Sequence, residues 1–510
     1  MGDEIQGPGE RPDELMEVRR AKVDRLEQLG VDPFPHAFRR SHLTREILDR
    51  FEEMEAKVGA SVAGRVVALR PMGKASFFHI EDAAGRLQVY VRRDDVGEHA
   101  YTVFKQIDLG DFVGVSGRPF RTRTGEISVH CEHLAILAKS LRPMPVIKEK
   151  DGRRYDAFSD REARYRYRYL DLMANREVRE LFHARARIIS CIRAYLDGRG
   201  FLEVETPILQ YRYGGAMARP FTTHHNALDS ALFLRIAEEL PLKKLLVGGL
   251  ERVYEIGKVF RNEGIDRMHN PEFTLLEFYW AYADYNDAMD LVEDLLRRTA
   301  SDVAGSLELQ WGGHRVDLAP PFRRARLLDL LRDAMGSDPM TESQESLRGV
   351  IRSKGKDAPP WAQRGHLLED LLDLLVVPTL AQPTFVMDYP REISPLAKRV
   401  RSGDGAFVER FELFVAGQEL ANSFSELNDP RDQRRRLESQ AGLKEQGDEE
   451  AQPFDEDFVT ALEHGMPPAA GVGIGIDRLV MLMTGSASIR DVVLFPHLRP
   501  LEKEPHGEDG

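Results

Sequence analysis

The fold of this chain depends on residues 251–285, ERVYEIGKVFRNEGIDRMHNPEFTLLEFYWAYADY, which predict two strands joined by a short loop. Successive side chains of an extended chain point to opposite faces. One face of the predicted hairpin therefore collects polar groups and rings: Glu255, Gly257, Val259, Arg261 and Glu263 from the first strand, and Phe273, Leu275, Glu277, Tyr279 and Ala281 from the second. A solvated face seldom mixes rings with charges in this way, whereas a ligand groove needs both. The hairpin is therefore predicted to form a wall of a binding groove.

Length and composition predict a soluble protein of two or three domains. The chain has 510 residues, 42% of them hydrophobic, and a formal net charge of -13. No apolar run approaches the ~20 residues of a membrane span, and the acidic N-terminus lacks the apolar segment of a secretory signal. Cys131 and Cys191 are the only cysteines, and they lack metal-ligand spacing. This usage favours a reducing compartment, so we expect a cytoplasmic protein without membrane association.

Residues 61–137 predict a small β-barrel. Five short alternating runs are separated by turns containing Gly, Asp and Pro, a pattern typical of an OB-fold. Arg70, Phe77 and Gln88 offer a cation, a ring and an amide on its expected binding face, which suits stacking and reading of unpaired bases. Because Phe78 follows Phe77, one of the two rings is expected to face outward.

Shifts in composition divide the chain into segments. We expect a helical extension (1–60), an OB-fold domain (61–140), a linker (141–160), a main domain (161–500) with a helical insertion near 320–385, and a disordered tail (501–510). Within the extension, residues 11–30 predict a helix that carries Arg19 and Lys22. Packing is the favoured role of this helix, and contact with RNA is the alternative.

Three ordered motifs resemble those of class II aminoacyl-tRNA synthetases. They are RGFLEVETP at 199–207 (motif 1), FRNE at 260–263 with His269 and Phe273 (motif 2), and GVGIGIDR at 471–478 (motif 3). The segments GGAMARPFTTHHNALD, NPEFT, DYPREISPLAK and NSFSELNDP are similar to those of bacterial-type lysyl-tRNA synthetases, and the resemblance extends from about Leu15 to Pro500. No class I signature, P-loop or GxGxxG fingerprint competes with it.

The resemblance implies an α+β protein with two parts. The first is an N-terminal OB-fold β-barrel that binds the anticodon, with Arg70, Phe77, Gln88 and Glu126 as binding residues. The second is a class II catalytic domain, an antiparallel sheet flanked by helices. The implied activity is ATP- and Mg2+-dependent ligation of L-lysine to tRNA(Lys) through a lysyl-adenylate. Motif 1 implies a homodimer.

Arginine is the residue type that adenylation requires on the motif 2 strand. Attack of a carboxylate on the α-phosphorus of ATP brings two anions together, and the planar fork of Arg261 can hold both. A surface ion pair of Arg261 with Glu255 or Glu263 is the alternative. The alternating glycines of motif 3 let a flat ligand approach the strand backbone. By resemblance, the ATP-binding residues are Arg261, Glu263, His269, Asn270, Phe273, Glu412 and Arg478, with Arg261 and Arg478 catalytic.

A second hairpin is predicted around Gly417. Glu412 and Glu419 can oppose each other across it, and two close carboxylates repel unless a cation or a proton joins them. By resemblance the pair binds magnesium with ATP; two solvated glutamates are the alternative. Residues further along the return strand have the opposite parity to Glu419, so a bulge near Ala421 is needed for all of them to face one groove.

An acidic groove predicts a cationic substrate, because buried carboxylates without a counter-ion are costly. By resemblance, the lysine-binding residues are Gly215, Glu239, Arg261, Glu277, Tyr279, Asn422, Phe424, Glu426 and Gly473. A ligase for aspartate or asparagine is one alternative, but it would need a cation at the side-chain end. A nucleic-acid-binding protein on an inactive synthetase scaffold and an enzyme that transfers lysine to a protein are the others.

Three positions depart from the pattern of the family. Residues 210–213, QYRY, are bulkier than the usual segment, Glu238 stands where proline is common, and Met268 stands where bacterial members often have arginine. The sequence leaves open whether Glu238 or Glu239 faces the substrate. It also leaves open whether Arg267 substitutes for the missing arginine.

Overall fold

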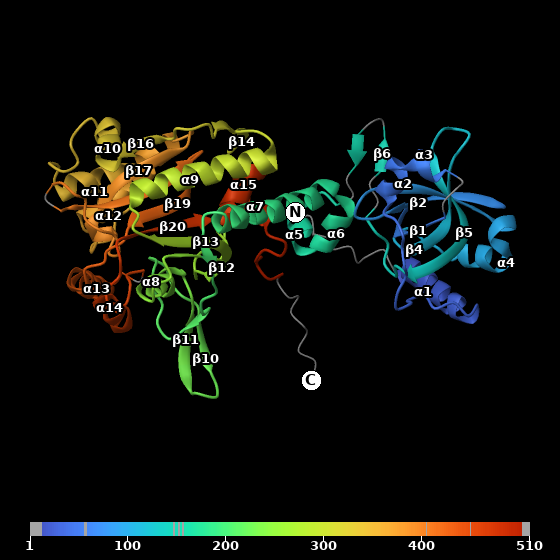
Figure 1. The fold of residues 1–510 in the computed structure, drawn as a ribbon, viewed down its shortest axis with the longest axis horizontal. Coiled ribbons are helices and arrows are strands. Elements are labelled where there is room, and N and C mark those ends of the chain that lie inside the picture. The colour runs from blue at the N-terminus through green and yellow to red at the C-terminus, as the bar shows by residue number, and fades with distance from the viewer. Residues whose placement is uncertain are drawn as a thin grey trace, which may run out of the picture. The chain divides into compact units, whose positions relative to one another are not determined.

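A computed structural model describes residues 13–55, 59–145, 148–150, 153–155, 158–403, 405–448 and 450–501. The chain divides into two compact units, residues 1–175 and 176–510 (Figure 1). None of the described helices combines the length and the apolar composition that a membrane span requires. The predicted disordered tail, apart from Leu501, lies outside the described residues.

The first unit is built on a closed barrel of five strands in the order β1-β2-β3-β5-β4. Its strands are β1 (Ala60–Met72), β2 (Ala75–Glu81), β3 (Arg86–Arg92), β4 (Phe112–Arg121) and β5 (Ile127–Ala138), and its helices are α1 (Asp13–Gln28), α2 (Thr44–Asp49), α3 (Phe51–Met54) and α4 (Arg93–Phe104). Alternate residues of β2 are buried, as expected for a strand with one face on a core. The predicted OB-fold barrel is confirmed. Phe78 is fully buried in its core, so Phe77 is the ring that faces outward.

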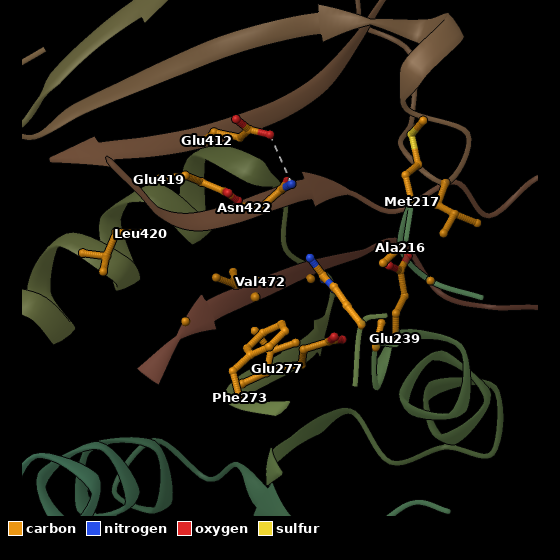
Figure 2. A pocket seen from close by; sticks show the side chains of 18 of the residues that line it. Ala216, Met217, Glu239, Phe273, Glu277, Glu412, Glu419, Leu420, Asn422 and Val472 are labelled. Atoms are coloured by element: carbon orange, nitrogen blue, oxygen red, sulfur yellow. Dashed lines mark hydrogen bonds between the residues drawn. The ribbon is translucent and has the colours of Figure 1, made fainter. Parts of the chain in front are cut away.

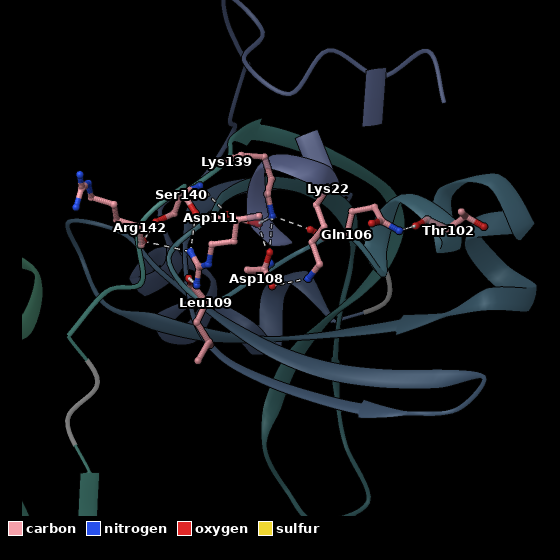
Figure 3. A network of polar contacts seen from close by, with 10 residues as sticks. Lys22, Thr102, Gln106, Asp108, Leu109, Asp111, Lys139, Ser140 and Arg142 are labelled. Carbon is pink, nitrogen blue, oxygen red and sulfur yellow. Dashed lines mark hydrogen bonds and ion pairs between the residues drawn. The ribbon is translucent and has the colours of Figure 1, made fainter. Parts of the chain in front are cut away.

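Helix α1 is fixed to this barrel by polar contacts (Figure 3). Arg19, 8% exposed, donates to the carbonyl oxygen of Ser140 at 2.5 Å. Lys22 Nζ lies 2.5 Å from a carboxylate oxygen of Asp108. A buried cation needs such partners, so these two basic residues act in packing within the unit, which was the favoured prediction for this helix.

The first unit extends further along the chain than predicted. Helices α5 (Arg161–Arg166) and α6 (Arg168–Ala174) belong to it, as does the two-stranded sheet of β6 (Lys148–Lys150) and β7 (Arg153–Tyr155). Phe158, Leu170 and Ala174 form an apolar cluster of their own. The first compact unit therefore ends at Asn175, and the start of the main domain at residue 161 stays a prediction.

The second unit is built on an eight-stranded sheet in the order β16-β17-β18-β19-β20-β13-β12-β8. The strands are β8 (Leu202–Glu203), β12 (Arg252–Phe260), β13 (Glu272–Ala281), β16 (Arg323–Arg326), β17 (Thr384–Pro390), β18 (Phe407–Val415), β19 (Gln418–Ser425) and β20 (Ala469–Gly475). Neighbours are antiparallel except at the two edges, where β16 pairs with β17 and β8 with β12 in parallel. The predicted antiparallel sheet is confirmed, with a parallel pair at each edge.

Helices α7 (Arg176–Asp197), α9 (Tyr285–Thr299) and α15 (Ile476–Thr484) share the main core with one face of this sheet. Apolar residues of α9 recur at helical spacing, and Asp284 caps its first turn by accepting from the N–H of Asn286 at 2.8 Å. On β13, Leu276 and Phe278 enter this core. Because side chains alternate along a strand, Glu277, which lies between these two residues, points to the opposite face of the sheet.

The remaining elements of the second unit lie around the sheet. They are β9 (Leu209–Gln210), β10 (Thr222–His225), β11 (Ser230–Leu234), α8 (Glu239–Val247), β14 (Glu308–Trp311), β15 (His314–Asp317), α10 (Leu327–Met335), α11 (Gln344–Ser353), α12 (Arg364–Leu371), α13 (Pro430–Glu445), α14 (Glu456–Glu463) and α16 (Ile489–Val492). The predicted helical insertion near 320–385 contains α10, α11 and α12, but it begins with β16 and ends in β17. Strand β16 has only four residues, RRAR, which are too few to show the alternation of a strand. The sequence therefore did not predict this edge of the sheet.

Candidate active site

A cavity of about 470 Å³ opens on the sheet face that carries Glu277 (Figure 2). Its lining includes these residues singled out from the sequence: Gly215, Glu239, Arg261, Glu263, His269, Asn270, Phe273, Glu277, Tyr279, Glu412, Glu419, Asn422, Phe424, Gly473 and Arg478. Of the residues predicted for this pocket, all of which the structure describes, Glu426 alone lies behind the cavity wall. Segments far apart in the sequence therefore meet in one pocket.

Strand β20 forms the floor between β13 and β19. Gly471 pairs with Tyr279 on one side and with Phe424 on the other. A Cβ at Gly471 would lie 2.2 Å from Glu426 Oε1 and 2.2 Å from Tyr279 Cε1. Glycine is therefore required here, because side chains of both neighbouring strands close over the backbone of β20.

The hairpin of β18 and β19 contains the predicted bulge. Glu412 pairs with Asn422, but Phe414 pairs with Glu419, so Leu420 is one residue too many for a regular ladder. This β-bulge adjoins the predicted position and lets residues of both parities line the cavity. The expectation of a directly opposed glutamate pair is corrected, because the shifted register places Asn422 across from Glu412.

Glu412 is held by three donors. Tyr389 Oη donates at 2.9 Å and Arg410 Nη2 at 2.5 Å. Asn422 Nδ2 donates at 3.3 Å, the contact drawn in Figure 2. Burial raises the pKa of Glu412 to about 7; Arg410 opposes this shift, and the charge of Glu419 adds to it. The site therefore holds a carboxylate that a further cation would favour in its ionised form.

The acidic pair fits the ligands that magnesium takes with a nucleotide. Mg2+ is usually bound through one or two carboxylates together with substrate phosphates and water, and Glu412 and Glu419 both line the cavity. Across the described parts of the chain, no group of three or more His, Cys, Asp or Glu side chains is arranged to hold a metal.

Cationic side chains gather around His269 and Phe273 at the cavity. Arg478, in the first turn of α15, donates through Nη1 to the carbonyl oxygen of Glu419 at 2.8 Å, and its Nη2 lies 3.1 Å from His269 Nε2. Nδ1 of the same imidazole lies 2.8 Å from Asp266 Oδ2. The guanidinium of Arg261 lies 5.1 Å from the ring centroid of Phe273, within cation–π range. This end of the cavity presents cations and a ring, as phosphates and a base require.

The motif 2 loop begins three residues earlier than the strand pattern predicts. Strand β12 ends at Phe260, so Arg261 and Glu263 belong to the loop and not to the strand face. The loop nevertheless brings both residues to the cavity lining. Met268 also lines the cavity, whereas Arg267 is exposed and is not part of the lining.

Glu277 marks the opposite end of the cavity. Its oxygens accept from the backbone N–H of Glu238 at 3.0 Å and from Tyr279 Oη at 2.9 Å. Burial and the nearby charge of Glu239 raise its pKa to about 7. A buried carboxylate that has only neutral donors in contact is suited to receive a cation.

The question of Glu238 or Glu239 has a clear structural answer. Glu239 lines the cavity, and Gly215 packs against it. The side chain of Glu238 is fully buried behind the wall, with Oε1 3.0 Å from Arg235 Nη2. Glu238 therefore contributes its N–H to the site, through Glu277, and not its carboxylate.

Sequence reasoning missed two cations next to this cavity. Lys243 is fully buried, with Nζ 2.5 Å from both Glu239 and Glu426; its spacing of four residues from Glu239 on α8 was a usable signal. Arg410 holds Glu412 and lies two residues before it on β18, so strand alternation would have found it. Glu369 of α12 also lines the cavity, but the unpatterned insertion gave no signal for it.

The bulky segment before Gly214 is anchored to the second unit. Tyr213 is 8% exposed, packs against Phe233 with ring centroids 5.1 Å apart, and accepts a hydrogen bond from Lys444. In the charged stretch that follows Lys444, Gln452 is buried and lines the cavity.

Strand pairing joins Arg70 to Phe77, and a hydrogen bond joins Gln88 to Glu126, among the predicted binding residues of the barrel. Phe77 pairs with Arg70 across β1 and β2. The amide of Gln88 donates to Glu126 at 2.6 Å, and its side-chain oxygen accepts from Ser128 at 2.8 Å. Gln88 is only 6% exposed and its polar groups are satisfied within the barrel, so the expectation of an exposed amide at this position is corrected.

The structure extends this face by rings that sequence reasoning missed. The ring of Tyr90 lies 5.0 Å from Phe77, 5.9 Å from Phe120 and 5.3 Å from His130, measured between centroids. Tyr90 has the parity of Gln88 on β3, which was the available signal. The resulting row of rings offers a stacking surface for unpaired bases.

Comparison with known proteins identifies similar chains over nearly the whole length. Residues 160–499 match the family model described as tRNA synthetases class II (D, K and N), and residues 60–137 match that of the OB-fold nucleic acid binding domain. A lysine–tRNA ligase of Moorella thermoacetica is 51% identical over 97% of this chain and 99% of its own. Lysine–tRNA ligases of Pelotomaculum thermopropionicum, 50% identical over 98% of both chains, and Enterococcus faecalis, 48% identical over 98% of this chain and all of its own, are similar.

Proposed function

Because the chain belongs to the class II tRNA synthetases, we propose that it is a lysine–tRNA ligase, which uses ATP to join L-lysine to tRNA(Lys). The single observation that supports lysine as the amino acid is the burial of the Glu277 carboxylate in the pocket. This carboxylate lies in the lining of the pocket, and the N–H of Glu238 and the hydroxyl of Tyr279, both neutral, donate to it. An aspartate or asparagine side chain would bring no positive charge to this carboxylate.

The first step forms lysyl-adenylate. An oxygen of the lysine carboxylate attacks the α-phosphorus of ATP, and pyrophosphate leaves. Arg261 lies between the two ends of the cavity and holds the carboxylate and the α-phosphate in line for this attack. Arg478, supported by its contact with Glu419, receives the terminal phosphates, and Phe273 stacks under adenine.

Magnesium belongs to the same proposal. Glu412 and Glu419 would hold it, and when bound it neutralises charge on the phosphate oxygens. Arg410 and Tyr389 keep Glu412 turned toward the cavity. In the second step a terminal ribose hydroxyl of the tRNA attacks the carbonyl carbon of the adenylate, and AMP leaves.

The tRNA and the second subunit complete the proposal. The barrel face with Arg70, Phe77, Gln88 and Glu126 binds the anticodon. A homodimer forms through motif 1, where Leu202 at the sheet edge is 51% exposed and available for burial. The free thiols Cys131 and Cys191 are consistent with a reducing, cytoplasmic location.

Amino-acid-dependent exchange of labelled pyrophosphate into ATP tests the proposal. A panel of the twenty amino acids should give exchange with lysine only, and the purified protein should then charge tRNA(Lys). Exchange with aspartate or asparagine in place of lysine would refute it, and a protein without exchange for any amino acid would favour an inactive scaffold.

A further inference from the structure

Lys243 provides a resident ammonium group directly behind the lysine end of the pocket. Its Nζ is fully buried, 2.5 Å from Glu239 Oε1 and 2.5 Å from Glu426 Oε2. The same nitrogen lies 5.0 Å from the ring centroid of Phe424. Burial lowers the pKa of Lys243, but the two carboxylates outweigh this effect and raise the pKa above its usual value. Lys243 therefore remains charged.

Three carboxylates meet at this end of the pocket, namely Glu239, Glu277 and Glu426. Lys243 is shared by two of them. The third, Glu277, accepts only from the N–H of Glu238 and the hydroxyl of Tyr279, which are neutral. Burial raises the pKa of all three carboxyl groups, so each is ionised most readily when a cation lies beside it. With all three ionised, the single ammonium group of Lys243 leaves two negative charges for a ligand.

Other nearby cations do not cancel this excess. Arg410 lies 2.5 Å from Glu412, and Arg478 lies 3.3 Å from Glu419. Arg235, behind the wall, lies between Glu238 and Glu255, at 3.0 and 2.6 Å. In the proposed reaction Arg261 serves the carboxylate and the phosphate.

We propose that Lys243 is a specificity-determining residue that acts through Glu239 and Glu426. Its ammonium group neutralises one of three carboxylates, so that the two remaining negative charges match the two ammonium groups of a lysine molecule. A charge left unbalanced in a buried site is costly, so the count of charges selects a ligand with two ammonium groups. This inference rests on the proposed lysine–tRNA ligase function and adds a group that does not touch the substrate.

Four proteins test the charge count: wild type, Lys243→Met, Glu426→Gln and the double variant Lys243→Met/Glu426→Gln. Either single change unbalances the site by one charge, whereas the double change removes one charge of each sign and restores the balance. Each single variant should raise the KM for lysine in pyrophosphate exchange by about 10- to 100-fold, and the double variant should return it to within about fivefold of wild type. The KM for ATP, whose residues do not contact Lys243, should stay near the wild-type value in all four.

The decisive comparison is Glu426→Gln against the double variant. Loss of Lys243 in the Glu426→Gln background removes an excess buried cation, so this comparison remains available even if Lys243→Met alone does not fold. If Lys243 had a structural role without charge balance, the increases in KM for lysine of the two single variants would multiply in the double variant. That result would overturn the inference. A wild-type protein without lysine-dependent exchange would refute the proposed function itself, which separates the two failures.

Discussion

The two ends of the pocket are built differently. At the lysine end, Glu277 is 4% exposed and Lys243 is fully buried, and their partners are fixed by strand and helix geometry. At the nucleotide end, His269 and Asp266 form a contact on an exposed loop, with side chains 50% and 60% exposed. Buried charges interact strongly and tolerate no mismatch, whereas exposed charges are screened by water and salt. In the proposed function, the groups that distinguish amino acids are thus buried, and the groups that meet the nucleotide are more exposed.

Arg261 joins the two ends, so its loss should have the largest effect. Arg261→Ala removes the cation proposed to bridge the lysine carboxylate and the α-phosphate, and kcat for pyrophosphate exchange should fall by about 10³-fold or more. Arg267→Ala, in the exposed part of the same loop, is the control and should exchange normally. A loss confined to KM for lysine would show that Arg261 serves one end alone.

Glu277→Gln tests the lysine end by itself. The substitution keeps the shape of the side chain but removes the charge, so KM for lysine should rise by about 100-fold while KM for ATP changes little. Glu272→Gln, at the start of the same strand and outside the cavity lining, is the matched control. Equal changes in both KM values would contradict the separation of the two ends.

Acid should weaken the lysine end. The pKa of Glu277 is raised to about 7, so the carboxylate takes up a proton as the pH falls through this value and no longer pairs with an ammonium group. We expect kcat/KM for lysine to fall by up to about tenfold per pH unit below 7. The contribution of Glu277 to the stability of the ligand-free protein has the opposite sign, because the folded state binds this proton more tightly than the unfolded state. The measurement is kcat/KM for lysine in pyrophosphate exchange by the wild type between pH 5.5 and 7.5. A value that does not change with pH would count against Glu277 as the carboxylate that binds the ammonium group of lysine.

His269→Ala is the counterpart at the nucleotide end. The imidazole supports Arg478 through Nε2 but is half exposed, so KM for ATP should rise by about tenfold and KM for lysine should stay unchanged. His224→Ala, on the exposed β10–β11 hairpin, provides the control. A larger effect on lysine than on ATP would reverse the assignment of the two ends.

The smallest effect concerns the position where the family often has proline. Glu238→Pro removes the N–H that Glu277 accepts and should raise KM for lysine by about fivefold, whereas Glu238→Ala keeps the N–H and should change KM by less than about twofold. If the alanine variant lost more affinity than the proline variant, the buried carboxylate and not the N–H would be the important group.

The sequence predicted much of this architecture because its signals are local. Alternation in the motif 2 hairpin, the glycines at 471, 473 and 475, and the opposite parities of Glu419 and Asn422 each specify a backbone geometry, including the bulge. The contribution of α8 could not be obtained in this way. Lys243 on α8 meets Glu426, which follows β19 much later in the chain, only through the tertiary fold. The acidic groove inferred from the sequence therefore lacked this cation. Glu369 on α12 could not be predicted either, because it reaches the cavity lining only through the packing of the helical insertion.

The bulge at Leu420 has a consequence for anyone who would alter this protein by insertion or deletion. The bulge changes which residues of strand β19 point to the cavity. Glu419 lines the cavity before the bulge, and Asn422 and Phe424 line it after the bulge. Deleting Leu420 would leave a regular strand and force one of the two sets into the core on the other side of the sheet. A single extra residue thus allows one short strand to contribute both to the nucleotide end and to the lysine end, and a hairpin grafted onto another scaffold would need this residue as much as the side chains themselves.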